Sequence, residues 1–173
     1  QLILDMLFML KLVSNNERIK IMAELFSLLK IDKNIESAES RMLTWDMVRE
    51  MAEWGVEFGS HSVSHSVLSS LSEEDVRAEL KHSKEKIEHE LGIECPTIAY
   101  PVGGDTAFNE QTISVVQESG YKLACSYLPG VVSAGKKNQY ALKRLHVDHS
   151  VQFGVFKGFL AMPSLLAADF RSD

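Results

Sequence analysis

The chain has 173 residues, of which 45% are hydrophobic and 24% charged, and its formal net charge is −6. This length and balance fit one globular domain with a sizeable core and leave no room for a long disordered linker. The lysines are dispersed among acidic residues without a basic stripe, so we expect neither nucleic acid nor an anionic membrane surface as a partner.

The sequence pattern of the N-terminal region predicts helices. Between residues 2 and 30 apolar residues recur at helical spacing, with a break at 14–16. The apolar opening contains Asp5 and Lys11, is too short to span a bilayer and lacks the features of a signal peptide, so no membrane span is expected. The first residue is Gln rather than Met, which suggests a natural N-terminus further upstream. We expect residues 1–40 to form a helical insertion or covering segment.

From residue 44 onwards, predicted helices and strands alternate. Thr44 and Ser72 can cap helices, and glycines follow the predicted helix ends. The predicted helices cover residues 44–54, 72–91 and 110–119, and the predicted strands cover residues 56–58, 97–100, 121–126 and 141–147. This alternation predicts an α/β fold with a parallel sheet, in which chemistry gathers at the carboxyl ends of the strands. A C-terminal helix and tail are expected at 151–173.

Two histidines follow the first predicted strand. His61 and His65 are four residues apart, and Gly59 with the small serines around them lets the backbone aim both imidazoles at one point. Such spacing suits Zn²⁺, Co²⁺ or Ni²⁺, but a catalytic zinc usually takes three protein ligands, so a carboxylate has to come from elsewhere. The alternative is that both are polar surface residues of a serine-rich loop.

A second feature ends the strand predicted at 97–100. Pro101 and Val102 are followed by two glycines, a pattern that lets a backbone N–H point into a site without a bulky neighbour. The alternative is a plain strand-ending turn.

These two segments resemble motifs of a known family. Residues 58–65, followed by Leu68 and Leu71, resemble the second motif of the polysaccharide deacetylases, the NodB homology domain of carbohydrate esterase family four. Residues 99–103 resemble its third motif, and the resemblance covers roughly residues 42–149. It implies an incomplete or distorted parallel (β/α) barrel of the polysaccharide deacetylase type with an extra N-terminal helical segment. Residues 41–150 would then be the catalytic domain.

The resemblance also implies roles for individual residues. His61 and His65 would bind a divalent metal, normally Zn²⁺ with Co²⁺ or Ni²⁺ as alternatives, together with an aspartate. The N–H of Val102 would help to hold the oxyanion. We expect the turn residues to border the substrate: Tyr100, Pro101 and Gly103. Many members have an arginine where this chain has Ala99, so the residue that orders the catalytic aspartate is missing here.

The family usually uses a histidine after a leucine, late in the chain, as the general acid. His146 follows Leu145 directly, whereas His149 stands two residues after Val147 and so resembles the usual leucine-x-histidine spacing. Both remain candidates, and Asp148 between them could orient either ring. The alternative is that both are polar residues at the end of a strand.

The family's first motif, two neighbouring aspartates that supply the base and the third metal ligand, has no counterpart in the sequence. We therefore expect the aspartate upstream of this chain, and the chain alone to be inactive. The expected activity of the parent protein is the hydrolytic removal of acetyl groups from an N-acetylated polysaccharide or oligosaccharide, in the cell envelope or outside the cell. Two alternatives remain: a catalytically dead carbohydrate-binding or interaction module, and a metal-dependent hydrolase of a small amide or ester. The sequence leaves the oligomeric state open.

Overall fold

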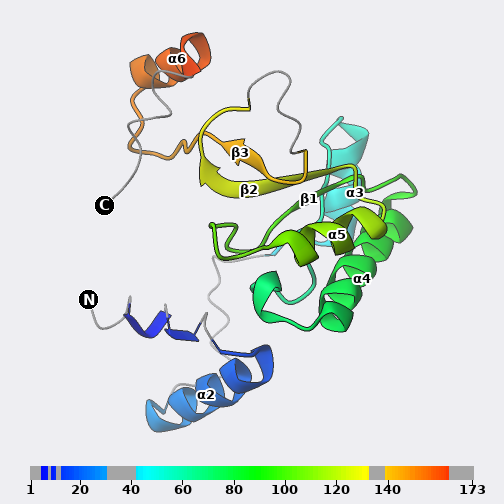
Figure 1. Ribbon diagram of the computed structural model, residues 1–173, viewed down its shortest axis with the longest axis vertical. Helices are drawn as coiled ribbons and strands as arrows, with labels where there is room; N and C mark the ends of the chain where they lie inside the picture. Colours follow the sequence, from blue (N-terminus) through cyan, green and yellow to red (C-terminus); the bar gives the residue numbers. More distant parts are fainter. Residues whose placement is uncertain (1–4, 8, 11–12, 31–41, 133–138, 164–173) are drawn as a thin grey trace.

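A parallel sheet forms the centre of the structure, which is a computed structural model (Figure 1). The structure describes residues 5–7, 9–10, 13–30, 42–132 and 139–163. The strands are β1 (Thr97–Ala99), β2 (Leu123–Pro129) and β3 (Leu142–Arg144). Their order is β1-β2-β3, both pairings are parallel, and Ala99 pairs with Cys125 in the first. The predicted parallel sheet is therefore confirmed, and the three carboxyl ends lie at one edge.

The segment before the histidine pair contacts the sheet at one residue. The N–H of Ser60 donates to the carbonyl of Thr97 at 2.9 Å, which makes an isolated parallel bridge beside β1. The strand predicted at 56–58 is wrong, because no strand is assigned along this described segment. The N–H of Val56 instead donates to the carbonyl of Met51 at 3.1 Å, since the chain is still leaving the preceding helix there.

Two helices pack against each other and against the sheet, α4 (Glu73–Leu91) and α5 (Glu110–Glu118). The hydroxyl of Ser72 accepts the N–H of Asp75 at 3.2 Å, and Gly92 with φ 67° ends α4, so both predicted boundaries of this helix are confirmed. Buried residues of these helices, of the sheet and of the adjoining turns form the core: Leu68, Val76, Leu80, Cys95, Ile98, Tyr100, Val115, Val116, Tyr121 and Ala124.

The boundaries of two strands differ from the prediction. Strand β2 begins at Leu123 rather than at Tyr121, because the N–H of Tyr121 donates back to the carbonyl of Val116 in α5 at 3.3 Å. Strand β3 is confined to Leu142–Arg144, so residues 145–147 follow the strand instead of extending it.

Three further α-helices and one 3₁₀ turn have defined bounds, α2 (Asn15–Leu28), α3 (Trp45–Glu53), η1 (Leu68–Ser70) and α6 (Phe153–Ala161), and residues 5–7 and 9–10 are helical as well. Of the break predicted at 14–16, only Ser14 lies outside α2, where it caps the helix in a reciprocal pair of hydrogen bonds with Glu17. Figure 1 shows α2 and α6 at opposite ends of the molecule, away from the sheet. The sheet and its two covering helices therefore form the frame for any site.

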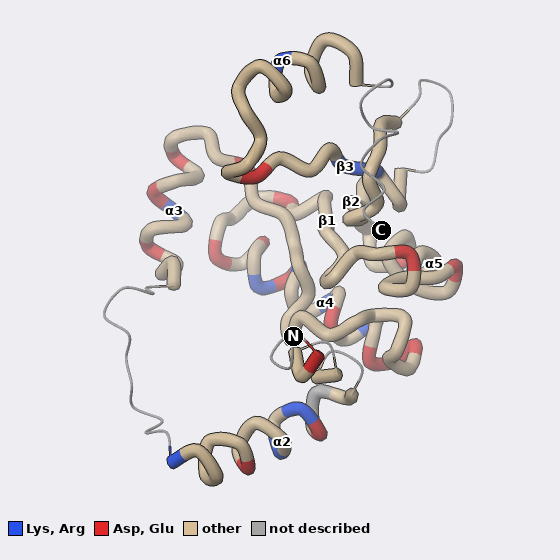
Figure 2. Tube along the Cα trace, turned by 90° about the vertical axis from the view of Figure 1, so that its left-hand side faces the viewer, with Lys and Arg blue, Asp and Glu red and all other residues tan. Residues whose placement is uncertain are grey.

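Charged residues of both signs lie on α2, α3 and α4. Figure 2 shows basic positions among acidic ones along the trace. On α4, three lysine–glutamate pairs are spaced four residues apart: Lys81–Glu85, Lys84–Glu88 and Lys86–Glu90. Of the helices that the structure describes, none combines the length and the apolar character that a membrane crossing requires.

Candidate functional site

A cleft of about 390 Å³ opens at the carboxyl ends of the strands. Its walls are His61, His65, Ala99, Tyr100, Val102, Tyr127 and Arg144. His61 follows the Ser60 bridge, Val102 follows β1, Tyr127 lies in β2 and Arg144 ends β3. Because parallel strands deliver their carboxyl ends to one edge, the sheet brings together the histidine pair and the turn that the sequence singled out.

The two imidazoles lie edge to face at this edge of the sheet. Their ring centroids are 4.8 Å apart and the interplanar angle is 78°. The Nδ1 of His61 is 2.7 Å from the carbonyl oxygen of Ala99. A carbonyl only accepts hydrogen bonds, so Nδ1 is the donor, and Nε2 remains available for another partner. This is the arrangement in which a protein carbonyl orients a metal-binding histidine.

The turn after β1 has a strained backbone. Val102 has φ 62°, a left-handed conformation that is uncommon for a β-branched residue. Gly103 has φ 65°, and a Cβ there would lie 2.8 Å from the backbone nitrogen of Tyr127. Its carbonyl accepts the N–H of Tyr127 at 2.6 Å, which ties the turn to β2. Among the described residues, the N–H of Val102 has no hydrogen-bond partner.

Tyr100 lines the cleft, although its side chain is almost fully buried. Its side chain is buried and stacks on Phe108 with ring centroids 4.3 Å apart, and its hydroxyl donates to the carbonyl of Tyr140 at 2.8 Å. Burial raises the pKa of this phenol. Pro101 and Gly103 are buried as well. Of the three predicted substrate-binding residues, Tyr100 therefore lines the cleft, whereas Pro101 and Gly103 do not.

His146 is connected to the cleft through Tyr127. The hydroxyl of Tyr127 is 2.8 Å from His146 Nδ1, and His146 Nε2 is 3.0 Å from the carboxylate of Asp148. Hydrogen bonds from the hydroxyl and the N–H of Ser150, together with the contact to His146, lower the pKa of Asp148 to about 2. The carboxylate is therefore ionised and holds a proton on Nε2. His149 is exposed and does not line the cleft.

Sequence reasoning missed Arg144. Its Nε donates to the carbonyl of Ser126 at 2.7 Å, and its guanidinium carbon lies 4.9 Å from the centroid of the Tyr127 ring. Stacking on an aromatic face and a backbone hydrogen bond hold the charge beside the cleft. Its place at the end of β3, two residues before His146, is the signal that could have identified it.

The cleft offers two ligands for a metal. Within the described ranges, no group of three or more His, Cys, Asp or Glu side chains could hold an ion. The donor set thus fits Zn²⁺, Co²⁺ or Ni²⁺ in part, with two imidazoles and no carboxylate.

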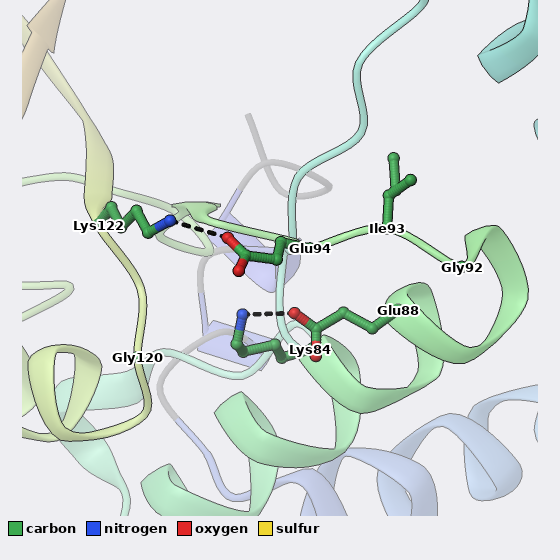
Figure 3. Close-up of a pocket in the computed structure, with 7 residues that line it drawn as sticks. All are labelled: Lys84, Glu88, Gly92, Ile93, Glu94, Gly120 and Lys122. Atoms are coloured by element: carbon green, nitrogen blue, oxygen red, sulfur yellow. Dashed lines mark hydrogen bonds and ion pairs between the residues drawn. The ribbon is translucent and has the colours of Figure 1, made fainter.

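A second hollow, remote from the histidines, is lined by charged residues of α4 and of the adjoining turns (Figure 3). Each lysine there is paired with a glutamate: Lys84 with Glu88 at 2.7 Å and Lys122 with Glu94 at 2.8 Å. Lys84 also donates to the carbonyl of Cys95, and Glu88 accepts its N–H. These contacts hold the turn after α4 in place, so we assign the charged residues of this hollow a structural role.

The chain is similar to known proteins in sequence. A model of the polysaccharide deacetylase family matches residues 18–124, more than half of the chain. YxkH of Bacillus subtilis, which carries the name of a polysaccharide deacetylase, is 28% identical over 118 residues, covering 68% of this chain and 41% of that protein. The chain thus spans about two fifths of the length of this relative.

Solved structures are similar to this chain as well. The Streptococcus pyogenes deacetylase PplD, solved in complex with acetate, matches with a TM-score of 0.64 and 26% identity, covering 71% of this chain and 53% of its own. BC0361, a polysaccharide deacetylase from Bacillus cereus, has the same fold with a TM-score of 0.62 at 22% identity, over 79% of this chain and 46% of its own. The incomplete (β/α) barrel expected from the sequence is confirmed. This chain belongs to the polysaccharide deacetylase family.

Proposed function

We propose that the cleft is part of the active site of an enzyme that removes acetyl groups from an N-acetylated polysaccharide with a divalent metal ion. The observation that carries the proposal is the meeting in one cleft of two imidazoles and of Val102, whose N–H no described residue accepts, with His146 bonded to the cleft wall. Membership of the deacetylase family and likeness to a deacetylase solved with acetate support the acetyl group as the group removed.

His61 and His65 would hold the metal, Zn²⁺ with Co²⁺ or Ni²⁺ as alternatives. The bond from His61 Nδ1 to the Ala99 carbonyl keeps Nε2 available as a ligand atom. A bound divalent ion would polarise the acetyl carbonyl and activate water for the attack. The third ligand would be an aspartate from outside the described cleft, since catalytic zinc sites usually have three protein ligands.

The backbone N–H of Val102 would donate to the oxyanion that forms when the acetyl carbon becomes tetrahedral. The left-handed φ of Val102 and the close packing of Gly103 against β2 fix the direction of this N–H before substrate binds. A fixed backbone donor needs no reorganisation during the reaction, and loss of one such donor typically slows a reaction about 10²- to 10³-fold.

His146, rather than His149, would be the general acid. A proton at Nδ1 of His146 faces the hydroxyl of Tyr127, which lines the cleft, while Asp148 holds the opposite nitrogen and stabilises the charged ring. Within the described part of the chain, His149 makes no hydrogen bond or ion pair with a residue of the cleft. This arrangement would deliver a proton to the amine as it leaves.

The experiment compares Zn²⁺ binding and acetate release. Calorimetry measures the Zn²⁺ Kd of the 173-residue chain and of the longest protein that its gene encodes, and acetate release is assayed on N-acetylglucosamine oligomers. We expect His61→Ala and His65→Ala each to weaken Zn²⁺ binding at least ~100-fold, because each removes a direct ligand. His89→Ala, an exposed histidine on α4, is the matched control and should bind as the unaltered protein does.

Acetate release is expected from the longest protein and not from the 173-residue chain, because no carboxylate is among the described residues that line the cleft. Equal Zn²⁺ affinity in His61→Ala and His89→Ala would contradict the metal site. Zn²⁺ binding without acetate release by the longest protein would contradict the deacetylase activity and favour a binding module.

A further inference from the structure

The loop that joins the two histidines has an uncommon backbone. Ser62 has φ 64° and His65 has φ 56°, both in the left-handed region, and neither is a glycine. Such conformations persist only where the surroundings hold them. The N–H of His65 donates to the hydroxyl of Ser62 at 3.1 Å, which closes the loop on itself but does not attach it to the rest of the fold.

Helix α4 supplies the attachment. One carboxylate oxygen of Glu79 accepts the N–H of Val63 at 2.8 Å and the N–H of Ser64 at 2.9 Å. Four residues later, the hydroxyl of Ser83 is 2.7 Å from that of Ser60, which begins the loop. Residues four apart lie on one face of a helix, so α4 holds the start and the middle of the loop from a single face.

The electrostatics of Glu79 suit this contact. Burial raises the pKa of its carboxyl, but the hydrogen bonds from Ser64 and Val63 outweigh it, and the net pKa is lowered. The carboxylate is thus charged at neutral pH, and hydrogen bonds to a charged acceptor are shorter and stronger than neutral ones. Arg18 of α2 contacts the loop from elsewhere, donating to the carbonyl of Ser64 at 3.3 Å.

We propose that Glu79 is a positioning residue that sets the separation and angle of the His61 and His65 imidazoles without touching either ring. The inference rests on the proposed function in so far as these rings bind a metal. Without the carboxylate, the N–H groups of Val63 and Ser64 lose their acceptor and the loop can relax from its left-handed conformation at His65. The second imidazole would then leave the edge-to-face position, 4.8 Å from the first, that the folded loop imposes.

The test uses Glu79→Ala, Glu79→Gln and a matched control, Glu85→Ala. Glu85 is an exposed carboxylate on the same helix, paired at 3.8 Å with Lys81 and remote from the loop contacts. Zn²⁺ Kd is measured by calorimetry, and the contact between the two rings is measured as a nuclear Overhauser effect between their protons in the metal-free protein. We expect Glu79→Ala to weaken Zn²⁺ binding about 10- to 100-fold, as loss of a supporting contact around metal ligands typically does.

The ring-to-ring signal should vanish in Glu79→Ala and persist in Glu85→Ala. Glu79→Gln keeps a carbonyl oxygen that can accept both N–H groups, so it should restore the ring contact and most of the affinity. If Glu79→Ala does not fold, the rates of amide hydrogen exchange at Val63 and Ser64 in Glu79→Gln still test the proposal. Exchange should be faster than in the unaltered protein because a neutral acceptor is weaker, and unchanged exchange would overturn the proposal.

The two proposals fail in different ways. If Glu79→Ala retains both Zn²⁺ affinity and the ring contact, Glu79 has no positioning role, while the metal site itself stands. If the unaltered protein binds no Zn²⁺, the proposed function loses its metal, and the ring contact alone decides whether Glu79 positions the pair.

Discussion

Gly103→Ala tests the turn that borders the cleft, with Gly92→Ala as its control. The two glycines have nearly the same φ, 65° and 67°, so an alanine pays the same left-handed penalty at both, about 1–2 kcal/mol. They differ in surroundings. A Cβ at Gly92 meets nothing within 4 Å, whereas a Cβ at Gly103 would lie 2.8 Å from the backbone nitrogen of Tyr127 and 2.9 Å from its Cβ.

Backbone atoms of β2 cannot move aside as a flexible side chain would. Overpacking of this kind typically costs a further ~1–3 kcal/mol, so we expect Gly103→Ala to lower the free energy of unfolding by roughly 2–5 kcal/mol and Gly92→Ala by about 1–2 kcal/mol. For a chain of this size each kcal/mol lowers Tm by about 2–4 °C.

Urea unfolding followed by far-UV circular dichroism measures both variants, and an unchanged m-value shows that the midpoint reports stability. The steric argument requires Gly103→Ala to be the less stable of the two. A Gly103→Ala protein as stable as Gly92→Ala would refute the close approach of the turn to β2, and with it the argument that packing fixes the Val102 N–H.

Three further predictions concern tyrosines. Tyr121→Phe should lower the free energy of unfolding by about 0.5–1.5 kcal/mol in urea titration, because the carbonyl of Leu80 loses one buried hydrogen bond while that from the Ser83 hydroxyl remains. Burial raises the pKa of Tyr100, so the stability it contributes is complete below the unfolded pKa of about 10 and is lost as pH rises above it. Unfolding midpoints between pH 8 and 11.5 should fall less steeply in Tyr100→Phe than in the unaltered protein. In the longest protein that the gene encodes, Tyr127→Phe should lower kcat for acetate release and shift its pH profile, since His146 loses one hydrogen-bond partner, while the unfolding midpoint stays nearly constant because the side chain is 52% exposed.

Sequence features that act on neighbouring residues predicted much of the fold. The Ser72 cap and Gly92 delimit α4 because both act on neighbouring backbone groups. The alternation of helices and strands gave the parallel sheet, and the sheet in turn placed the histidine pair and the Val102 turn in one cleft.

Other features could not be predicted in this way. The strand expected at 56–58 failed because one hydrogen bond from Val56 back to the preceding helix competes with pairing to β1. Arg144 and Glu79 were missed because their contacts join distant segments of the chain. Arg144 reaches the cleft through the register of β3, and Glu79 contacts the histidine loop from one face of α4. Neither contact leaves a local pattern in the sequence.

Backbone strain is concentrated at the cleft. Outside glycine, four described residues have left-handed φ, and three of them, Ser62, His65 and Val102, belong to the histidine loop or the adjoining turn. Each such residue costs stability, so the fold has to provide compensating contacts. Here these contacts come from Glu79 beneath the loop and from the fit of Gly103 against β2. The same contacts that offset the strain also direct two imidazoles and one N–H into the cleft, which is why the strained segments and the proposed chemistry coincide.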